Sequence, residues 1–336
     1  MIDRARSHEL FHRNQGNPIL TPEQFPRPVN AVFNPGVTVI DGRTLLLMRV
    51  EGRTGLSSLI TAVSDDGISG WEIDVTRGLY PEVQSVEERW GIEDPRITRV
   101  GDEYYVVYVG YSAAGPLVLL AVTKDFEHWD RRGVLMSPED KDAALFPTTF
   151  NGRWALMHRP VPSMSGLGNH IWMSFSPDLR HWGDSRVVLP ARSGGWWDAN
   201  KVGLGPPPLL TTQGWLVCYH AVRVTASGSV YRLGLALFDR DNPTKMLARA
   251  NEWVMGPREG YERNGDVPGV VFPCGWVLRD DGDTLHLYYG AADTVICLAE
   301  ASLATLLDHL EAFPLPSRST DVGLFMPDDS GELGFP

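Results

Sequence analysis

Five times along this chain, a proline-marked apolar segment passes through a Gly- or Asp-containing turn into a second apolar segment that ends in polar residues. The five segments are FNPGVTVIDGRTLLLMRVEGR, EDPRITRVGDEYYVVYVGYS, LFPTTFNGRWALMHRP, GPPPLLTTQGWLVCYHAV and VFPCGWVLRDDGDTLHLYYGAADT. Apolar runs joined in this way predict β-hairpins. Their recurrence at roughly 50 to 70 residues, with almost no helical period, is typical of the blades of a β-propeller.

A second shared element follows four of these hairpins, and each copy holds strand-like residues on both sides of an Asp, Asn or Gly turn. The four copies are SDDGISGWEI, TKDFEHWDRRG, SPDLRHWGDSRVV and DRDNPTKMLAR. They predict the third and fourth strands of each blade. The sequence therefore predicts an all-β, five-bladed propeller over residues 29–303. We expect residues 1–28 to form an extension that wraps the outside or contacts another subunit, and 304–336 to form a C-terminal helix and tail.

Composition and charge exclude several classes of protein. A formal net charge of −12 argues against a nucleic-acid partner, which requires a basic surface. The sequence contains no run of about 18 apolar residues and no apolar signal segment, so we expect neither membrane insertion nor secretion. Cys218, Cys274 and Cys297 lack metal-ligand spacing and predict buried thiols in the cytoplasm. No P-loop, dinucleotide-binding or zinc motif is present, so we expect no metal or organic cofactor.

The hairpin pattern predicts where the functional residues lie. A hairpin returns to the end where it began, so residues before the first strands and after the second strands share one face of the propeller. Those residues are polar or charged in several blades. They are Asn34, Asp94, Arg49, Arg53, His158, Arg159, Tyr219, His220 and Asp293.

Asp94 is the candidate catalytic acid. It lies in the motif Glu93-Asp94-Pro95-Arg96, and Asp before Pro is also common in ordinary turns. Its position at the entry of a first strand directs it toward the central channel. A carboxyl in such a channel can act as a general acid, so we expect this role.

Three residues on neighbouring blades predict an anion site. Arg159 could be an edge-strand arginine, Lys201 a solvated charge and His220 a core histidine, and each explanation is adequate alone. Together they place cationic groups at one end of one channel in an acidic protein. Because such groups repel one another unless an anion lies between them, the cluster indicates a bound phosphate.

The ordered motifs resemble glycoside hydrolase family 130, the mannoside phosphorylases with a five-bladed propeller. The resemblance covers residues 30–303 and is carried by FNPG, LLLMRVEGRTGLSSL, IEDPRIT, MHRP, NKVGLGPPPL, GWLVCYHAV, LALFDRDNP, GYERNGDVPGVVFPCG and YYGAADT. Two positions depart from the family pattern: Ala221 stands where a Gly usually follows the Tyr-His pair, and Gly269 stands where an Asn often precedes the Val-Val-Phe strand. The resemblance implies that Asp94 is the general acid, that Arg159, Lys201, His220 and Arg53 bind phosphate, and that Asn34, Arg49, Ser57, His158, Tyr219, Asp266 and Asp293 bind the sugar.

The implied reaction is inverting phosphorolysis of a β-1,2- or β-1,4-mannoside with inorganic phosphate, which yields α-D-mannose 1-phosphate. Phosphate is itself a nucleophile, so such an enzyme needs cations and can dispense with the base that an inverting hydrolase requires. A β-mannosidase on the same fold would need Glu259 or Glu262 as that base.

Two further alternatives stay open. A five-bladed arabinanase or fructosidase would need a third acid, and a non-catalytic propeller would use exposed aromatics to bind sugar. Residues 163–169 and 191–197 are candidate acceptor loops. The linkage, the acceptor sugar and a possible homo-oligomer stay undetermined by the sequence. The aromatic candidates for sugar stacking are Tyr111, Trp196, Trp197 and Tyr261.

Overall fold

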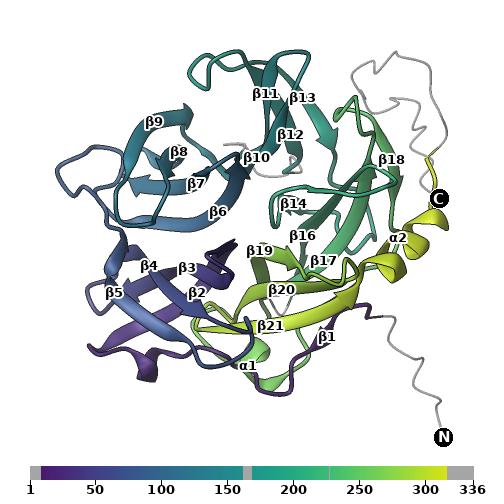
Figure 1. Cartoon of the computed structure of the whole chain (residues 1–336). Coiled ribbons are helices and arrows are strands. Elements are labelled where there is room, and N and C mark those ends of the chain that lie inside the picture. Colours follow the sequence, from purple (N-terminus) through teal and green to yellow (C-terminus); the bar gives the residue numbers. More distant parts are fainter. Residues whose placement is uncertain (1–8, 162–168, 227, 316–336) are drawn as a thin grey trace, which may run out of the picture.

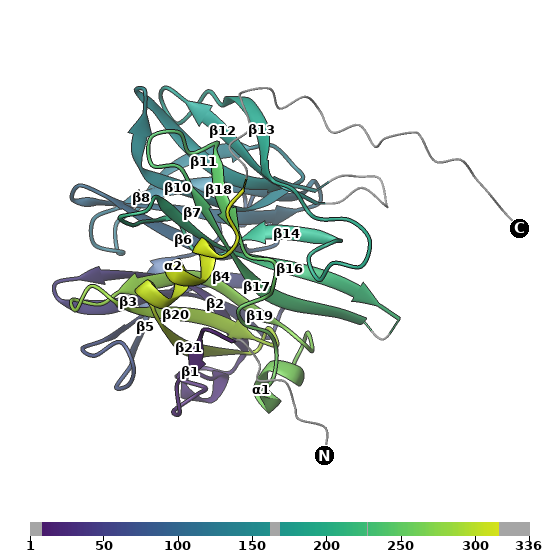
Figure 2. The ribbon, with the colours of Figure 1, turned by 90° about the vertical axis from the view of Figure 1, so that its right-hand side faces the viewer.

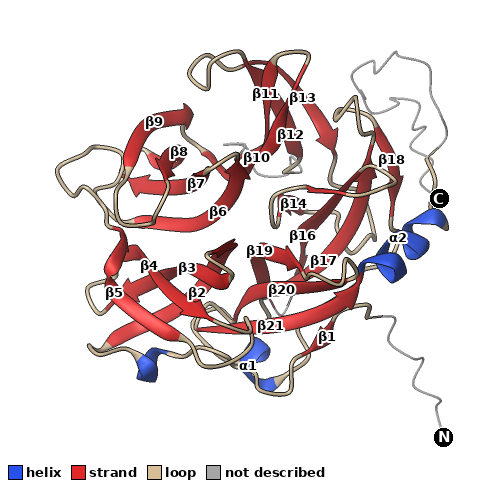
Figure 3. Ribbon diagram, viewed as in Figure 1, coloured by secondary structure: helices blue, strands red, loops and turns tan. Residues whose placement is uncertain are grey.

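The computed structural model describes residues 9–161, 169–226 and 228–315, whose strands form five antiparallel sheets around a common centre (Figure 1). Strands dominate the described residues, and the helical segments lie at the periphery (Figure 3). The predicted five-bladed propeller is therefore confirmed.

Each blade follows the predicted order, with the first strand innermost. Within the described residues, blade 1 contains β2–β5, blade 2 β6–β9, blade 3 β10–β13, blade 4 β14 and β16–β18 with β15 beside β16, and blade 5 β19–β21. Their bounds are β2 Val29–Ile40, β3 Arg43–Gly52, β4 Ser57–Ser64, β5 Glu72–Leu79, β6 Ile92–Val100, β7 Glu103–Ser112, β8 Gly115–Thr123, β9 Asp130–Met136, β10 Asp140–Phe150, β11 Arg153–Pro160, β12 Ile171–Ser176, β13 Gly183–Leu189, β14 Lys201–Leu204, β15 Leu209–Leu210, β16 Trp215–Thr225, β17 Gly228–Phe238, β18 Met246–Arg249, β19 Val271–Leu278, β20 Thr284–Ala291 and β21 Val295–Ser302.

The apolar pattern of each strand follows its depth in the blade. The second strands β3, β7 and β16 are buried almost continuously, because neighbouring blades cover both faces of the sheet. The outer strands β5 and β9 instead alternate between exposed and partly buried residues. Within a blade, continuous apolar runs therefore indicate inner strands, and alternating runs indicate outer strands.

The turns between strands use the residues that the sequence analysis singled out. Asp41-Gly42 and Asn151-Gly152 each have positive φ at both positions, as a two-residue hairpin turn requires. In the turn between the third and fourth strands, one aspartate accepts two backbone N–H groups. This aspartate is Asp66 in blade 1, Asp125 in blade 2, Asp178 in blade 3 and Asp239 in blade 4.

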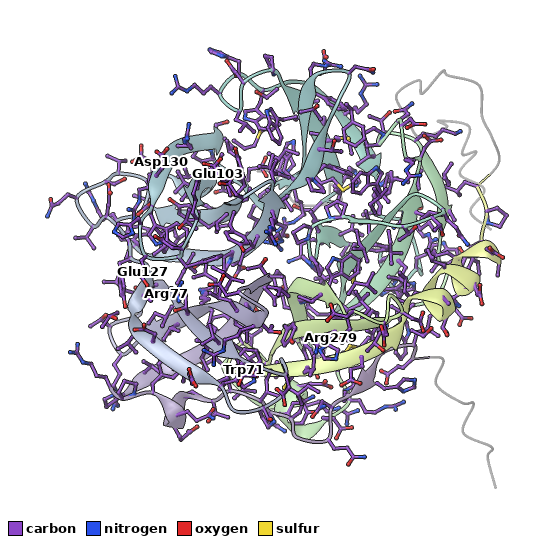
Figure 4. The ribbon with its side chains drawn as sticks, in the orientation of Figure 1. Trp71, Arg77, Glu103, Glu127, Asp130 and Arg279 are labelled. Carbon is purple, nitrogen blue, oxygen red and sulfur yellow. The ribbon has the colours of Figure 1, made fainter. Side chains whose placement is uncertain are left out.

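The core lies between the blades. In the described residues, a cluster of buried apolar side chains separates each pair of neighbouring blades. Between blades 3 and 4, for example, the rings of Phe146 and Trp215 meet edge to face at 5.0 Å. Contacts at the rim also join blades, and Figure 4 shows Arg77 of blade 1 beside Glu127 of blade 2, with 3.5 Å between Nε and Oε1.

The N-terminal segment closes the ring. Strand β1 (His12–Arg13) pairs with β21 and supplies the outer strand of blade 5, where the purple start of the chain meets its yellow end (Figure 1). Leu20 also pairs with Ile296. The part of residues 1–28 that the structure describes thus belongs to the fold of the propeller. Residues 1–8 of the expected extension lie outside the described residues.

The C-terminal part begins with helix α2 (Leu303–Glu311), which packs against blades 4 and 5 through Leu306, Leu307 and Leu310 (Figure 2). Its N-cap Ser302 accepts a hydrogen bond from the Thr305 amide. Residues 316–336 of the expected tail lie outside the described part. Within the residues that the structure describes, no helix has the length and apolar character that a bilayer span requires. The three cysteines are buried and free.

Candidate active site

The same backbone irregularity occurs in the first strands of blades 1, 2 and 3. In each, two residues oppose one residue of the second strand, which defines a β-bulge, and the first of the two has positive φ. These residues are Asn34 at 46°, Asp94 at 51° and Asp142 at 51°. Asn and Asp adopt this conformation more readily than other residues with side chains. All three side chains are buried.

Asp94 is held by two predicted partners. Its Oδ1 accepts hydrogen bonds from Asn34 Nδ2 at 2.9 Å and from Arg49 Nη1 at 3.2 Å. Arg49 also donates to Ser57 Oγ at 3.1 Å and to Glu93 at 2.8 Å. The structure thus joins Asn34, Arg49, Ser57 and Asp94, which the sequence analysis predicted, with Glu93, to which it gave no role.

Asp293 of blade 5 faces the same carboxylates. Burial, and then the negative charge of Asp94, raise the pKa of Asp293 to about 7. Burial also raises the pKa of Glu93, although the charge of Arg49 opposes this effect. Groups whose pKa is shifted by burial and by neighbouring charges cluster at catalytic sites.

A second cluster surrounds Asp142. Its carboxylate accepts a hydrogen bond from Arg159 Nε at 2.7 Å, and its Oδ1 lies 3.8 Å from Arg96 Nη2. His220 Nε2 lies 3.4 Å from Asp142 Oδ2. Burial alone would raise the pKa of Asp142, but the charge of Arg159, and then the contacts with His220 and Arg96, hold it well below its usual range. Asp142 is therefore ionised.

Arg96 connects the two clusters. Its guanidinium donates to the carbonyl oxygens of Gly205 at 2.7 Å and Leu204 at 2.8 Å in blade 4, and to the Asp94 carbonyl at 3.2 Å. Because Arg96 also lies against Asp142, it joins strands of blades 2, 3 and 4 around the channel. The Arg96 guanidinium thus links Asp94 and the Asp142 cluster directly.

Lys201 and Tyr231 complete the second cluster. Lys201 Nζ donates to the Tyr231 hydroxyl at 3.1 Å. Burial, with the charge of Arg159, lowers the pKa of Lys201 to about 8. Lys201 is therefore mostly protonated at pH 7 but loses its charge in mildly alkaline solution.

His220 contributes a polar ring without a charge. It is fully buried between Phe272, at 4.5 Å between ring centres, and Tyr231, at 6.0 Å. Burial lowers the pKa of His220 to about 4, so the ring is neutral at pH 7. Neither ring nitrogen has a hydrogen-bond partner of good geometry within the described residues. Buried polar atoms normally have partners, so this ring is a candidate contact for a ligand.

These contacts correct one argument from the sequence. The sequence predicts that the clustered Arg159, Lys201 and His220 require an external anion, but the protein places the Asp142 carboxylate between Arg159 and His220. His220 is also neutral rather than cationic. The remaining argument for an anion site rests on Lys201, on the Arg159 Nη2 group, which has no hydrogen bond within the described residues, and on the unpartnered His220 ring.

Two predicted sugar-binding residues have other partners in the structure. His158 contacts Asp140 at 2.6 Å and Ser174 at 2.8 Å through its two ring nitrogens. The Tyr219 hydroxyl lies 3.2 Å from both Asp198 Oδ2 and Arg249 Nε. His158 and Tyr219 adjoin Arg159 and His220, and neighbouring strand residues point to opposite faces. Contact of these two residues with substrate stays a prediction.

The remaining candidates lie on loops. Arg53 and Asp266 are exposed, and Asp266 accepts a hydrogen bond from Asn30 at 3.2 Å. Of the candidate acceptor loops, 191–197 is described and carries the exposed Trp196, whereas all of 163–169 except Asn169 lies outside the described residues. Their contacts with substrate also stay predictions.

The two candidate bases of a hydrolase do not adjoin Asp94 in the contacts of the structure. Glu262 is fully buried and accepts hydrogen bonds from Arg13, Tyr289 and the backbone amides of Arg258 and Glu259. Glu259 is exposed at the N-terminus of helix α1 (Gly260–Arg263). The carboxylate of Glu262 is committed to holding the N-terminal segment.

Sequence reasoning missed Asp142, Arg96, Glu93 and Tyr231. A signal for Asp142 exists, because Asn34, Asp94 and Asp142 precede the end of the second strand by similar distances. Pro35 and Pro95 directly follow Asn34 and Asp94, and the sequence analysis matched them with Pro147 of the motif LFP, which does not follow Asp142. A second bulge between Leu145 and Thr149 separates Asp142 from Pro147 in blade 3 and hides the equivalence.

Comparisons with known proteins identify the family of the chain. A family model described as "beta-1,4-mannooligosaccharide phosphorylase" matches residues 4–312. The 1,2-beta-oligomannan phosphorylase of Thermoanaerobacter sp. (strain X514) is 36% identical over 279 residues, which cover 80% of this chain and 89% of that protein. The beta-1,4-mannooligosaccharide phosphorylase of Ruminococcus albus is 31% identical over 316 residues, which cover 92% and 93%.

A solved structure gives the same result. The beta-1,2-mannobiose phosphorylase from Listeria innocua, in complex with beta-1,2-mannobiose, superposes with a TM-score of 0.82 at 32% identity. The match covers 90% of this chain and 99% of that chain. The predicted resemblance is thus confirmed in sequence and in structure, and the chain belongs to glycoside hydrolase family 130, the mannoside phosphorylase family.

Proposed function

We propose that the protein catalyses the inverting phosphorolysis of a β-mannoside and releases α-D-mannose 1-phosphate. The observation that carries the proposal is the pairing of one amide- and arginine-held acid, Asp94, with a neighbouring cluster that presents Lys201, Arg159 and the unpartnered His220. The family relatives, which are named as mannoside phosphorylases, support the same reaction.

On the acid side, Asp94 gives its proton to the glycosidic oxygen as the bond from that oxygen to the mannosyl C1 breaks. The leaving sugar thus departs as a neutral hydroxyl. Asn34 and Arg49 fix the Asp94 carboxyl through a single oxygen, Oδ1, which leaves Oδ2 for the proton transfer. Arg49 is itself fixed by Ser57, Glu93 and the Phe33 ring, 4.5 Å from its guanidinium carbon.

On the nucleophile side, a phosphate oxygen forms the new bond to C1 from the opposite face, which converts a β-mannoside into an α-phosphate. Lys201 and Arg159 supply positive charge for the phosphate, and the neutral His220 supplies a ring N–H. Phosphate arrives as an anion, so no protein base has to activate it. No metal or organic cofactor takes part in this scheme.

A hydrolase on the same fold is the alternative, but the candidate base Glu262 already accepts hydrogen bonds from Arg13, Tyr289 and two backbone amides. We also propose that the enzyme works in the cytoplasm, which the free, buried cysteines support. The linkage is proposed as β-1,2 or β-1,4, since relatives named for both match the chain.

We expect cleavage to depend on inorganic phosphate. Wild-type enzyme in phosphate-free buffer should leave β-1,2- and β-1,4-mannobiose intact, and added phosphate should produce mannose 1-phosphate. K201A and R159A should each weaken phosphate use by about 10- to 150-fold, because a lost charge-assisted contact costs about 1.5–3 kcal/mol. The KM for the sugar should change far less. Initial rates over a matrix of both substrates measure the two effects separately.

Full activity without phosphate, with free mannose as the product, would refute this proposal and favour the hydrolase. Synthesis in reverse from α-mannose 1-phosphate, with mannose, glucose and N-acetylglucosamine as acceptors, identifies the acceptor preference in the same preparation.

The alkaline limb of phosphate affinity should report Lys201. Because its pKa is lowered to about 8, the protonated form that attracts phosphate is present below this pH and is lost above it. The KM for phosphate should therefore rise between about pH 7.5 and about pH 9.5. K201R keeps its charge throughout this range, so its profile should be flat even if its KM is higher. An identical limb in both proteins would assign the titration to another group.

A further inference from the structure

Asp142 is a buried carboxylate that the sequence analysis did not include among the site residues. It occupies the bulge position that Asn34 and Asp94 occupy in blades 1 and 2, with a φ of 51°. Positive φ in a residue other than glycine is uncommon, and such conformations concentrate at functional sites. One backbone device therefore presents three different groups to the channel: an amide, the catalytic acid and an ionised carboxylate.

The contacts of Asp142 act on the residues proposed to bind phosphate. Arg159 donates its Nε to Asp142 at 2.7 Å and its Nη1 to Asn169 at 3.2 Å. These two bonds fix the plane of the guanidinium and leave Nη2 without a hydrogen bond in the described part of the chain. The Asp142 carboxylate also lies 3.4 Å from His220 Nε2.

Gly203 makes room for this arrangement. It pairs with His220 in the ladder between β14 and β16. A Cβ atom at position 203 would lie 2.3 Å from Asp142 Oδ2 and 2.5 Å from His220 Nε2, closer than real Cβ contacts allow. Gly203 does not adopt positive φ, so its backbone conformation suits alanine. The glycine is explained by the space that the Asp142 and His220 side chains occupy.

We propose that Asp142 is a positioning residue for the phosphate nucleophile: its carboxylate fixes the Arg159 guanidinium and the His220 ring. Gly203 provides the space for the contact between Asp142 and His220. The inference rests on the proposed phosphorolysis. Asp142 acts through its neighbours and does not touch phosphate, because a carboxylate repels that anion. Its charge also offsets part of the positive charge of Arg96 and Arg159, so that these groups stay packed in the absence of phosphate.

The test compares D142N and G203A with wild type. D142N keeps the shape of the side chain and tolerates positive φ, but it removes the charge. G203A keeps every charge and separates Asp142 from His220. Each variant should raise the KM for phosphate by about tenfold to 100-fold, with a change of less than about threefold in the KM for the mannoside. In an R159A background, D142N should have a smaller effect than it has alone, because the part that acts through the oriented Arg159 guanidinium is already lost.

The matched control is E88Q. Glu88, in the connection between β5 and β6, is also buried and is bonded to Tyr108 of β7 and Arg131 of β9, and no hydrogen bond or ion pair within the described residues joins it to Asp94 or Asp142. E88Q should lower thermal stability without separating the two KM values. If D142N is not recovered folded, the result from G203A decides. Equal changes in both KM values, or additive effects of D142N and R159A, would overturn the inference.

The change in Tm on adding phosphate measures phosphate binding, so it tests the role of Asp142 separately from the proposed phosphorolysis. Wild type that cleaves mannosides without phosphate would refute the proposed function. The inference would still hold if phosphate raised the Tm of wild type and E88Q but not that of D142N or G203A. It would fail if phosphate changed none of these Tm values.

Discussion

Replacing Asp94 by asparagine should lower kcat by about 10²- to 10⁴-fold, in phosphorolysis and in synthesis alike, because general acids contribute this much and an amide has no proton to give. The fold should persist. Asparagine accepts the positive φ of this position, 51°, and its oxygen can still accept hydrogen bonds from Asn34 and Arg49. Initial rates in both directions, with circular dichroism to check the fold, measure the effect.

The matched control is D41N, the same chemical change at another positive φ of 51° in the exposed turn between β2 and β3. It should leave kcat unchanged. If D94N kept more than about a tenth of wild-type activity, Asp94 could not be the acid. Glu93 and Asp293, the nearby carboxyl groups with raised pKa, would be tested next.

Replacing Arg13 by alanine should destabilise the protein by about 3–5 kcal/mol, because it strands the fully buried charge of Glu262. Burial pushes the pKa of Glu262 upward, but hydrogen bonds from Arg13 and two backbone amides outweigh it and lower this pKa. Glu262 is thus ionised when paired. Equilibrium unfolding in urea, for wild type and R13A, measures the loss of free energy.

The control for this prediction is R43A. Arg43 forms ion pairs with Asp65 and Glu72 on the surface, where solvent screens such pairs, so this substitution should change stability little. E262Q in the R13A background should recover part of the stability, since a neutral amide is cheaper to bury unpaired than a carboxylate. A loss in R13A no larger than that in R43A would show that the N-terminal segment does not stabilise the ring.

Most of the architecture could be predicted from the sequence, because the second strands are continuous apolar runs and the turn before each of them contains Gly, in blades 1, 3 and 5 as Asp-Gly or Asn-Gly. Strand β1 could not. It has two residues, His12 and Arg13, and no apolar pattern, and it pairs with β21 at the far end of the chain. Long-range pairing of so short a segment depends on the tertiary packing around Glu262 and leaves no local trace.

The candidate site could also be predicted only in part. Asp94, Arg159 and Lys201 stand in motifs at predicted strand ends. In two pairs of adjacent residues, the sequence could not tell which member faces the channel. The pairs are His158 with Arg159, and Tyr219 with His220. That choice depends on register, which the bulges shift by one residue. The neutral state of His220 arises from burial between Phe272 and Tyr231, rings from two other strands.

The closure of blade 5 by the first strand of the chain also sets the order in which the molecule can be built. On the ribosome β1 emerges first, yet its partner β21 is among the last strands to appear, so it waits unpaired while blades 1 to 4 are synthesised. Asp293 lies in the turn that leads into β21. The last part of the proposed catalytic site and the seam of the ring should therefore form in the same event. We expect nascent chains that lack blade 5 to contain Asp94, Arg159 and Lys201 but not Asp293.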